Sequence, residues 1–238
     1  MARLRPRRLI GWLVGAAAAV VVLSVGGAFV YIHFISGPAP APLSLHSSAP
    51  SAGTSGTAAA STTAALAGSW RVAAGSIVGY RVNEVLAGQN NVAVGRTDHI
   101  SGSLTITGDS VTAASFTVQM ATVRSDESER DVQFNGRIMD TSAYPTGTLT
   151  LTKPISLGSV PAVGVIRDYE AAGTLTLHGQ TRAVRFALQA ERTASVIEVS
   201  GSIPIVFADW GIGNPSFPPF VTTQNHGELE FLVKFSRA

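Results

Sequence analysis

Cysteine is absent from this chain of 238 residues, and charged residues are scarce at 13%. The lack of cysteine excludes disulfide bonds, thiol catalysis and metal sites built on thiolates, although it is compatible with export. Hydrophobic residues make up 45% of the sequence, which indicates a globular chain with an apolar excess. Most of that excess lies in one stretch near the amino terminus.

A basic surface for nucleic acid is also missing, although the formal net charge is +2 and the pI is about 9.3. Four of the 17 basic residues precede the apolar stretch, at positions 3, 5, 7 and 8. Without them, 13 basic residues stand against 15 acidic ones, a formal charge of −2. This balance provides no footprint for phosphates, so we predict no nucleic-acid partner.

The apolar stretch runs from Leu9 to Ile35, 27 residues without Asp, Glu, Lys or Arg. As a helix it would extend about 40 Å, enough to cross a hydrocarbon core of roughly 30 Å. A cleaved signal peptide has a shorter apolar region that ends in small residues, whereas Tyr31–Ile35 is bulky. Because the arginines precede the stretch, we predict a single-pass signal-anchor at residues 1–35 of a cell-membrane protein, with a cytoplasmic amino terminus and an extracytoplasmic domain.

Two further segments follow the predicted anchor. Residues 36–68 are rich in Pro, Ala, Ser, Thr and Gly and carry no periodic pattern, which is typical of a flexible linker. As a flexible coil, this linker would span about 30 Å. Residues 69–238 have the length of one folded domain.

Alternation of apolar and polar residues predicts the secondary structure of that domain. The pattern is clearest in Arg167–Glu191, where two alternating runs joined at His178–Gln180 indicate an antiparallel hairpin. Runs of the same kind bring the total to eight substantial strands, and Ser125–Asn135 is predicted as a short helical insertion that Ser125 or Asp126 caps and Gly136 ends. The other runs are 77–82, 100–107, 114–120, 147–152, 197–207 and 228–235.

Eight antiparallel strands form either a sandwich or a closed barrel, and two features favour the barrel. The strands are long, and glycine recurs on their inward faces, where it permits sharp coiling and leaves space inside. The same glycines are also compatible with simple relief of bends. They are Gly102, Gly147, Gly173 and Gly201.

The predicted strands lack the groups that catalysis needs. Their inward faces contain no Asp, Glu, Lys, Arg or His, and the chain has neither a G-x-S-x-G elbow nor a G-x-G-x-x-G after a strand. His99, His178 and His226 have no ligand spacing, so we predict no metal, no catalytic residue and no enzyme activity. An apolar interior of this kind either binds an acyl or isoprenoid chain or is filled by its own side chains.

Four segments carry a resemblance to a known family. They are Gly95-Arg96-Thr97 with Ile100-Ser101-Gly102, Glu129-Arg130-Asp131 with Phe134, Asp140 and Tyr144-Pro145, Gly173–Thr181, and Asp209-Trp210-Gly211-Ile212. In this order they resemble the motifs of the YceI-like family, exported lipocalin-like barrels that bind polyisoprenoid lipids. One departure is Phe207, where the family often has Arg. If that Arg holds a head group, this protein binds a different head group or holds it elsewhere.

The resemblance implies a lipocalin-like barrel, and together with the sequence pattern it predicts an all-β fold, an eight-stranded antiparallel lipocalin-like barrel with a short helical insertion, preceded by the one transmembrane helix predicted above. It implies a membrane-tethered protein of the cell envelope that holds or carries a polyisoprenoid-type lipid, with no cofactor besides that lipid. The alternative is a solid barrel that serves as a structural or interaction domain.

The predicted site has two parts, a barrel lining that contacts the ligand and a mouth or lid. The lining comprises Tyr80, Leu104, Phe116, Val118, Leu149, Ala171, Gly173, Leu175, Phe186, Leu188, Gly201, Ile203, Phe207 and Phe231. The mouth comprises Arg130, Asp131, Phe134, Asp209 and Trp210.

Overall fold

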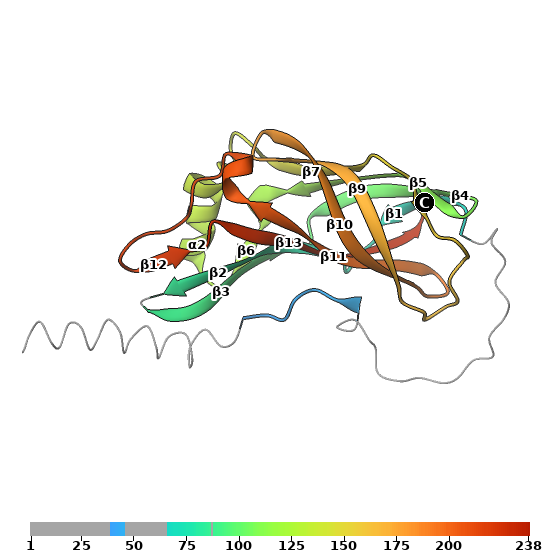
Figure 1. The fold of residues 1–238 in the computed structure, drawn as a ribbon, viewed down its shortest axis with the longest axis horizontal. Helices are drawn as coiled ribbons and strands as arrows, with labels where there is room; N and C mark the ends of the chain where they lie inside the picture. The colour runs from blue at the N-terminus through green and yellow to red at the C-terminus, as the bar shows by residue number, and fades with distance from the viewer. Residues whose placement is uncertain (1–38, 46–65, 87) are drawn as a thin grey trace, which may run out of the picture.

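The computed structural model describes residues 39–45, 66–86 and 88–238, and this part of the chain is an all-β domain with one short helical segment (Figure 1). The predicted anchor lies outside the described residues, among which no helix is long and apolar enough to cross a membrane. The strands are β1 (Gly68–Val72), β2 (Ile77–Leu86), β3 (Gln89–Thr97), β4 (Ile100–Thr107), β5 (Ser110–Gln119), β6 (Arg124–Ser125), β7 (Thr146–Leu151), β8 (Ile155–Ser156), β9 (Arg167–Leu177), β10 (Gln180–Arg192), β11 (Val196–Val206), β12 (Val221–Thr223) and β13 (His226–Arg237). The helical segments are η4 (Met120–Thr122), α2 (Ser128–Gln133), η5 (Phe134–Ile138) and η6 (Phe207–Trp210).

Eight of these strands close into a ring in the order β1-β4-β5-β7-β9-β10-β11-β13, because β13 pairs back onto β1. All eight pairings in the ring are antiparallel, which confirms the predicted eight-stranded antiparallel barrel. The strand that closes the ring was not predicted. β1 contacts only the last part of β13, and the earlier part, Glu228–Leu232, pairs with β2.

The hairpin of β2 and β3 therefore extends from the barrel wall. β3 pairs with the short β6, and β12 adds to the other edge of β2 near its end. The Gly- and Asn-rich stretch after β2 is shorter as a loop than its composition suggests, since β3 begins at Gln89. Asn90 and Asn91 pair with Val85 and Glu84, so cross-strand bonding overrides their turn preference.

The helical insertion begins later and ends later than predicted. α2 starts at Ser128 with Glu127 as its N-cap and no side-chain capping bond, and Gly136 lies inside the π-helical turn η5. Ser125 does not cap the helix because Asp131 engages it. The Asp131 Oδ1 accepts hydrogen bonds from the Ser125 amide and hydroxyl, each at 2.8 Å.

The apolar side chains inside the barrel form two clusters, one toward each end. One surrounds Trp70 and Phe235 near β1, where the indole of Trp70 donates a hydrogen bond of 3.0 Å to the carbonyl of Leu66. The other lies toward α2 and includes Phe134, Phe186 and Trp210. Phe231 packs against both clusters, so the interior is continuous along the barrel.

The outer face of β13 is unusual because two of its outward residues are buried. Glu230 is 4% exposed and Leu232 is 6% exposed. The Glu230 carboxylate pairs with Arg81 of β2 at 3.3 Å and with Arg96 of β3 at 2.8 Å. We call Arg81, Arg96 and Glu230 the outer-face triad. Residues 39–45 lie against it, within the stretch predicted as a free linker.

Candidate functional site

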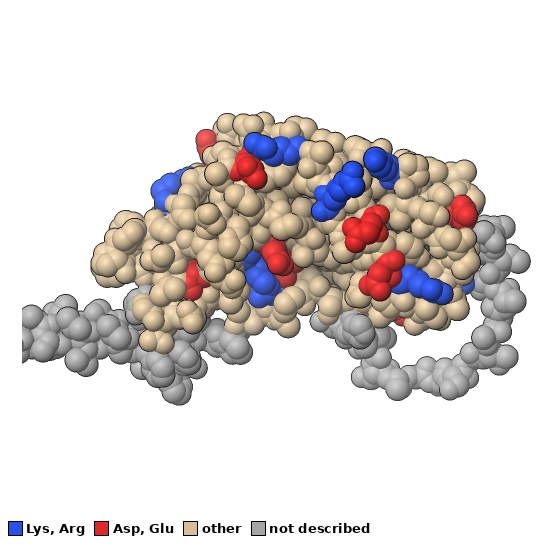
Figure 2. Space-filling model, in the orientation of Figure 1, with Lys and Arg blue, Asp and Glu red and all other residues tan. Residues whose placement is uncertain are grey.

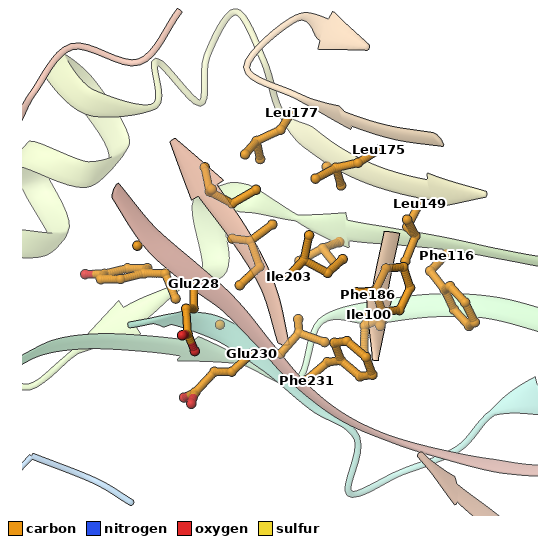
Figure 3. A pocket seen from close by; sticks show the side chains of 18 of the residues that line it. Ile100, Phe116, Leu149, Leu175, Leu177, Phe186, Ile203, Glu228, Glu230 and Phe231 are labelled. Atoms are coloured by element: carbon orange, nitrogen blue, oxygen red, sulfur yellow. The ribbon is translucent and has the colours of Figure 1, made fainter. Parts of the chain in front are cut away.

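A large cavity of about 1120 Å³ runs through the interior of the described domain. Its wall is built almost entirely from apolar side chains of β2, β4, β5, β7, β9, β10, β11 and β13. In Figure 3 the side chains of Leu149, Leu175, Phe186, Ile203 and Phe231 point from these strands into one shared space. The solid-barrel alternative therefore does not describe this structure.

The cavity is long as well as large. On β9 every second residue from Tyr169 to Leu177 lines it, which corresponds to about 27 Å along the strand. This alternation is the inward register that the sequence pattern predicts. A bore of this length suits an extended chain rather than a compact ligand.

The two ends of the cavity differ. Near β1 it ends against Leu66, which is 6% exposed, and against Leu157 of the loop before β9. At the opposite end its wall includes Phe217 and Phe220, which are 64% and 55% exposed. We call this second end, between α2, β12 and the tip of the β2–β3 hairpin, the mouth.

All but one of the residues predicted to line the barrel lie on the cavity wall. The exception is Gly201, where an added Cβ would come within 2.7 Å of the Phe231 ring and 2.8 Å of the Ala187 carbonyl oxygen. An added Cβ at Gly102 would likewise come within 2.7 Å of the Phe116 ring. At these two positions the missing side chain makes room for a neighbouring ring, whereas Gly147 and Gly173 lie on the cavity wall. That the lining residues contact a ligand stays a prediction.

The prediction of an uncharged interior is wrong at the mouth. The inward face of β2 continues from Tyr80 through Val82 to Glu84, and the guanidinium of Arg130 on α2 lies 3.2 Å from the Glu84 carboxylate. Arg130 also pairs with Asp126. Burial opposes the charging of Arg130, but Glu84 and Asp126 outweigh it and raise its pKa above the ordinary value. The mouth therefore holds a charged guanidinium that two carboxylates share.

Tyr80 is the polar group that lies next to this ion pair. Its ring stacks on Phe134 with centroids 5.2 Å apart, and its other side lies on Gly95, where a Cβ would come within 2.3 Å. Burial raises the pKa of Tyr80, so the phenol stays neutral. Within the described part of the chain its hydroxyl has no hydrogen-bond partner, which leaves one buried O–H facing the cavity.

The sequence of the barrel domain also matches the model of a known domain over most of the domain's length. Residues 70–235 match the model of the YceI-like domain. The chain belongs to the YceI-like family. A search of curated proteins found no match to it.

Two solved structures share the YceI-like fold of this chain. A polyisoprenoid binding domain from Saccharophagus degradans, implicated in plant cell wall breakdown, has a TM-score of 0.59 at 18% identity; the match covers 71% of this chain and 98% of that one. The protein BcnA of Burkholderia cenocepacia has a TM-score of 0.51 at 19% identity and covers 65% of this chain and 95% of its own.

The residues that carry the YceI-like motifs around the mouth divide into two groups. Arg130 and Phe134 line the cavity, as does Phe207, which stands where the family often has Arg. Asp131, Asp209 and Trp210 do not line it. The guanidinium at this mouth therefore comes from α2 and was predicted there, but its partner Glu84 was missed because the alternation of β2 was followed only to Val82.

The three outlying residues have structural contacts instead. Asp131 holds Ser125, as described above, and Asp209 is exposed in η6. Trp210 is 3% exposed, and its carbonyl oxygen lies 3.1 Å from Nδ1 of His178. His178 also meets Tyr144 edge to face, so this histidine joins a turn to η6. Among the described residues, no group of three His, Asp or Glu is placed to hold a metal ion.

Proposed function

We propose that this protein binds a long apolar lipid of the polyisoprenoid type inside its barrel. The observation that carries the proposal is the apolar cavity of about 1120 Å³, which exceeds the roughly 300–1,000 Å³ of sites for drug-sized ligands. The YceI-like family and the polyisoprenoid binding domain of Saccharophagus degradans support it. Catalysis is not part of the proposal, because Arg130, Glu84 and Asp126 are engaged with one another in ion pairs.

The mouth favours a lipid with an uncharged head group. The charged residues on the cavity wall in this half are Glu84, Glu127, Glu129, Glu228 and Glu230 against Arg130 and Arg137. Arg130 is already shared by two carboxylates, and carboxylates outnumber guanidinium groups on this wall, so a phosphorylated head group would meet net repulsion. The Tyr80 hydroxyl is available to donate a hydrogen bond to a hydroxyl or carbonyl oxygen, as in a polyprenol or a quinone.

The test of lipid binding uses residues 39–238, expressed without the predicted anchor. We expect the purified domain to carry a lipid that organic extraction and mass spectrometry identify as a long isoprenoid chain. Delipidated protein should take up added polyprenol or quinone in native mass spectrometry, and polyprenyl phosphate much less. Protein that is isolated empty and takes up none of the three would contradict the proposal.

We further propose that the protein is tethered to the cell membrane by residues 1–35, with the barrel outside the cytoplasm. The support for this is the charge-free run Leu9–Ile35 after a cluster of arginines. We expect the full chain to resist alkaline extraction from membranes and to keep this segment when its amino terminus is read by mass spectrometry. A mature terminus between Ser36 and Gly68 would show that the segment is cleaved.

A further inference from the structure

Residues 39–45, which we call the docked segment, lie as an extended stretch along the outer face of β13, β2 and β3 (Figure 1). The outer-face triad fixes its backbone through three hydrogen bonds, and Leu45 at its end is 3% exposed. The bonds run from Arg81 to the Pro40 carbonyl at 2.6 Å, from Arg96 to the Ala41 carbonyl at 2.5 Å, and from the Leu43 amide to Glu230 at 3.3 Å.

The direction of the docked segment follows from its register on the sheet. Arg81 bonds to Pro40, and Glu230 bonds to Leu43. Glu230 lies opposite Gly79 of β2, two residues before Arg81, so Arg81 is the nearer of the two to the tip of the β2–β3 hairpin. The chain therefore runs from the mouth toward the opposite end of the barrel near β1, which we call the closed end. In Figure 1 the segment begins on the side of α2 and β12 and leads away from it.

The mouth itself presents an apolar rim without charge. Large hydrophobic side chains are exposed there on three separate elements, and Gly211–Asn225 contains no Asp, Glu, Lys or Arg. In Figure 2 the protruding end formed by β12 and the loop before it shows neither blue nor red side chains. We call the exposed side chains Val85, Val132, Phe217 and Phe220 the rim.

The length of chain before the docked segment limits which end of the barrel reaches the membrane. Ile35 and Pro40 are five positions apart in the sequence, a stretch of chain that spans at most about 17 Å. Arg81 beside Pro40 is five residues from Leu86 at the mouth, also about 17 Å along the strand. The closed end of the barrel, near β1, is too far from Pro40 to reach the membrane. Glu228 lies opposite Arg81, and from there to Ser236 at the closed end the distance along β13 is about 27 Å.

We propose that the docked segment holds the barrel with its mouth against the lipid bilayer, so that the rim enters the membrane interface. This inference rests on the proposed membrane anchor. Aromatic side chains favour that interface, and apolar contact gains free energy in proportion to the area buried. Because the rim side chains themselves are uncharged, the contact needs no anionic lipid. A lipid then enters or leaves the cavity directly from the bilayer.

The absence of cysteine makes the test direct, because one introduced thiol labels one site. The full chain is reconstituted in phosphatidylcholine vesicles that contain a spin-labelled lipid, with a fluorophore on either Gly213→Cys or Ser195→Cys. A Cβ at Gly213 meets nothing within 4 Å, and Ser195 is exposed in the turn between β10 and β11 at the closed end. We expect most of the fluorescence at position 213 to be quenched and that at position 195 to be retained, in low and in high salt.

A second variant tests the role of the docked segment. Leu43→Asp places a carboxylate beside buried Glu230 and should release the segment by like-charge repulsion. Quenching at position 213 should then fall to the level of position 195. Ala41→Asp, which adds the same charge at an exposed position of the segment, should keep the difference.

Three results would overturn the inference. Equal quenching at the two positions rejects the mouth-down orientation, and a difference that survives Leu43→Asp rejects the docked segment as its cause. Protein that fails to float with the vesicles rejects the anchor and the orientation together. The lipid content of residues 39–238 is measured in a separate experiment, so none of these three results bears on the proposed lipid ligand.

Discussion

Ala171→Phe should empty the barrel of lipid. Ala171 lies on the inward face of β9, lines the cavity and is 3% exposed, and its partner across the strand pair is Phe186. A phenyl ring at this position projects into the bore midway between Tyr169 and Gly173 and narrows it for a continuous chain. We expect the lipid that co-purifies with residues 39–238 to fall by about tenfold or more, equivalent to roughly 1.4 kcal/mol of binding free energy.

The stability of the variant tells whether the ring enters open space. In delipidated protein the ring should cost less than about 1 kcal/mol, whereas forcing it into a packed core costs about 1–3 kcal/mol or more. Delipidated samples are needed because a bound ligand itself raises the apparent stability. The matched control is Ala187→Phe on the exposed face of β10, which should keep its lipid. A drop in melting temperature above about 6 °C would place packed side chains, not a bore, at Ala171.

Glu230→Ala should produce the largest loss of stability on the outer face. Glu230 is 4% exposed and forms ion pairs with both Arg81 and Arg96, so its removal leaves two cations beside one another without their partner. Breaking a buried ion pair costs about 3–5 kcal/mol, and the partial exposure of both arginines places this case near the lower end. The melting temperature should fall by roughly 6–12 °C, because about 2–4 °C accompanies each kcal/mol at this size.

The same variant should also loosen the docked segment. Without the carboxylate, the Leu43 amide loses its acceptor, and its hydrogen exchange should accelerate in residues 39–238. The control is Glu228→Ala on the same strand, an exposed residue with no ion pair in the described part of the chain, which should change stability by less than about 0.5 kcal/mol. An unchanged melting temperature for Glu230→Ala would mean that the triad contributes no net stability.

Much of the barrel was predictable from local pattern alone. β9 alternates in burial because one face lines the cavity and the other faces outward. The same alternation identified thirteen of the fourteen predicted lining residues as cavity wall. Period-two patterning is a local property, so a single sequence carries it in full.

Elements whose partners are distant in sequence were missed. β1 is only five residues long, and it becomes a barrel strand because β13 and β4 flank it. The docked segment has no periodicity at all, and only the triad, contributed by three strands, gives it a place. Pro, Ala and Ser composition alone is the same for a free linker and for a segment that lies on a protein surface.

By itself, the sequence determined the strand pattern, the apolar inward register and the family to which the chain belongs. The tertiary structure decided whether that register encloses a solid core or a cavity, because free volume depends on how far apart the facing strands are held. It also decided that Glu84 meets Arg130 at the mouth and that residues 39–45 lie on Glu230 and its arginines. These contacts join residues 46 and 187 positions apart, a separation that no local pattern records.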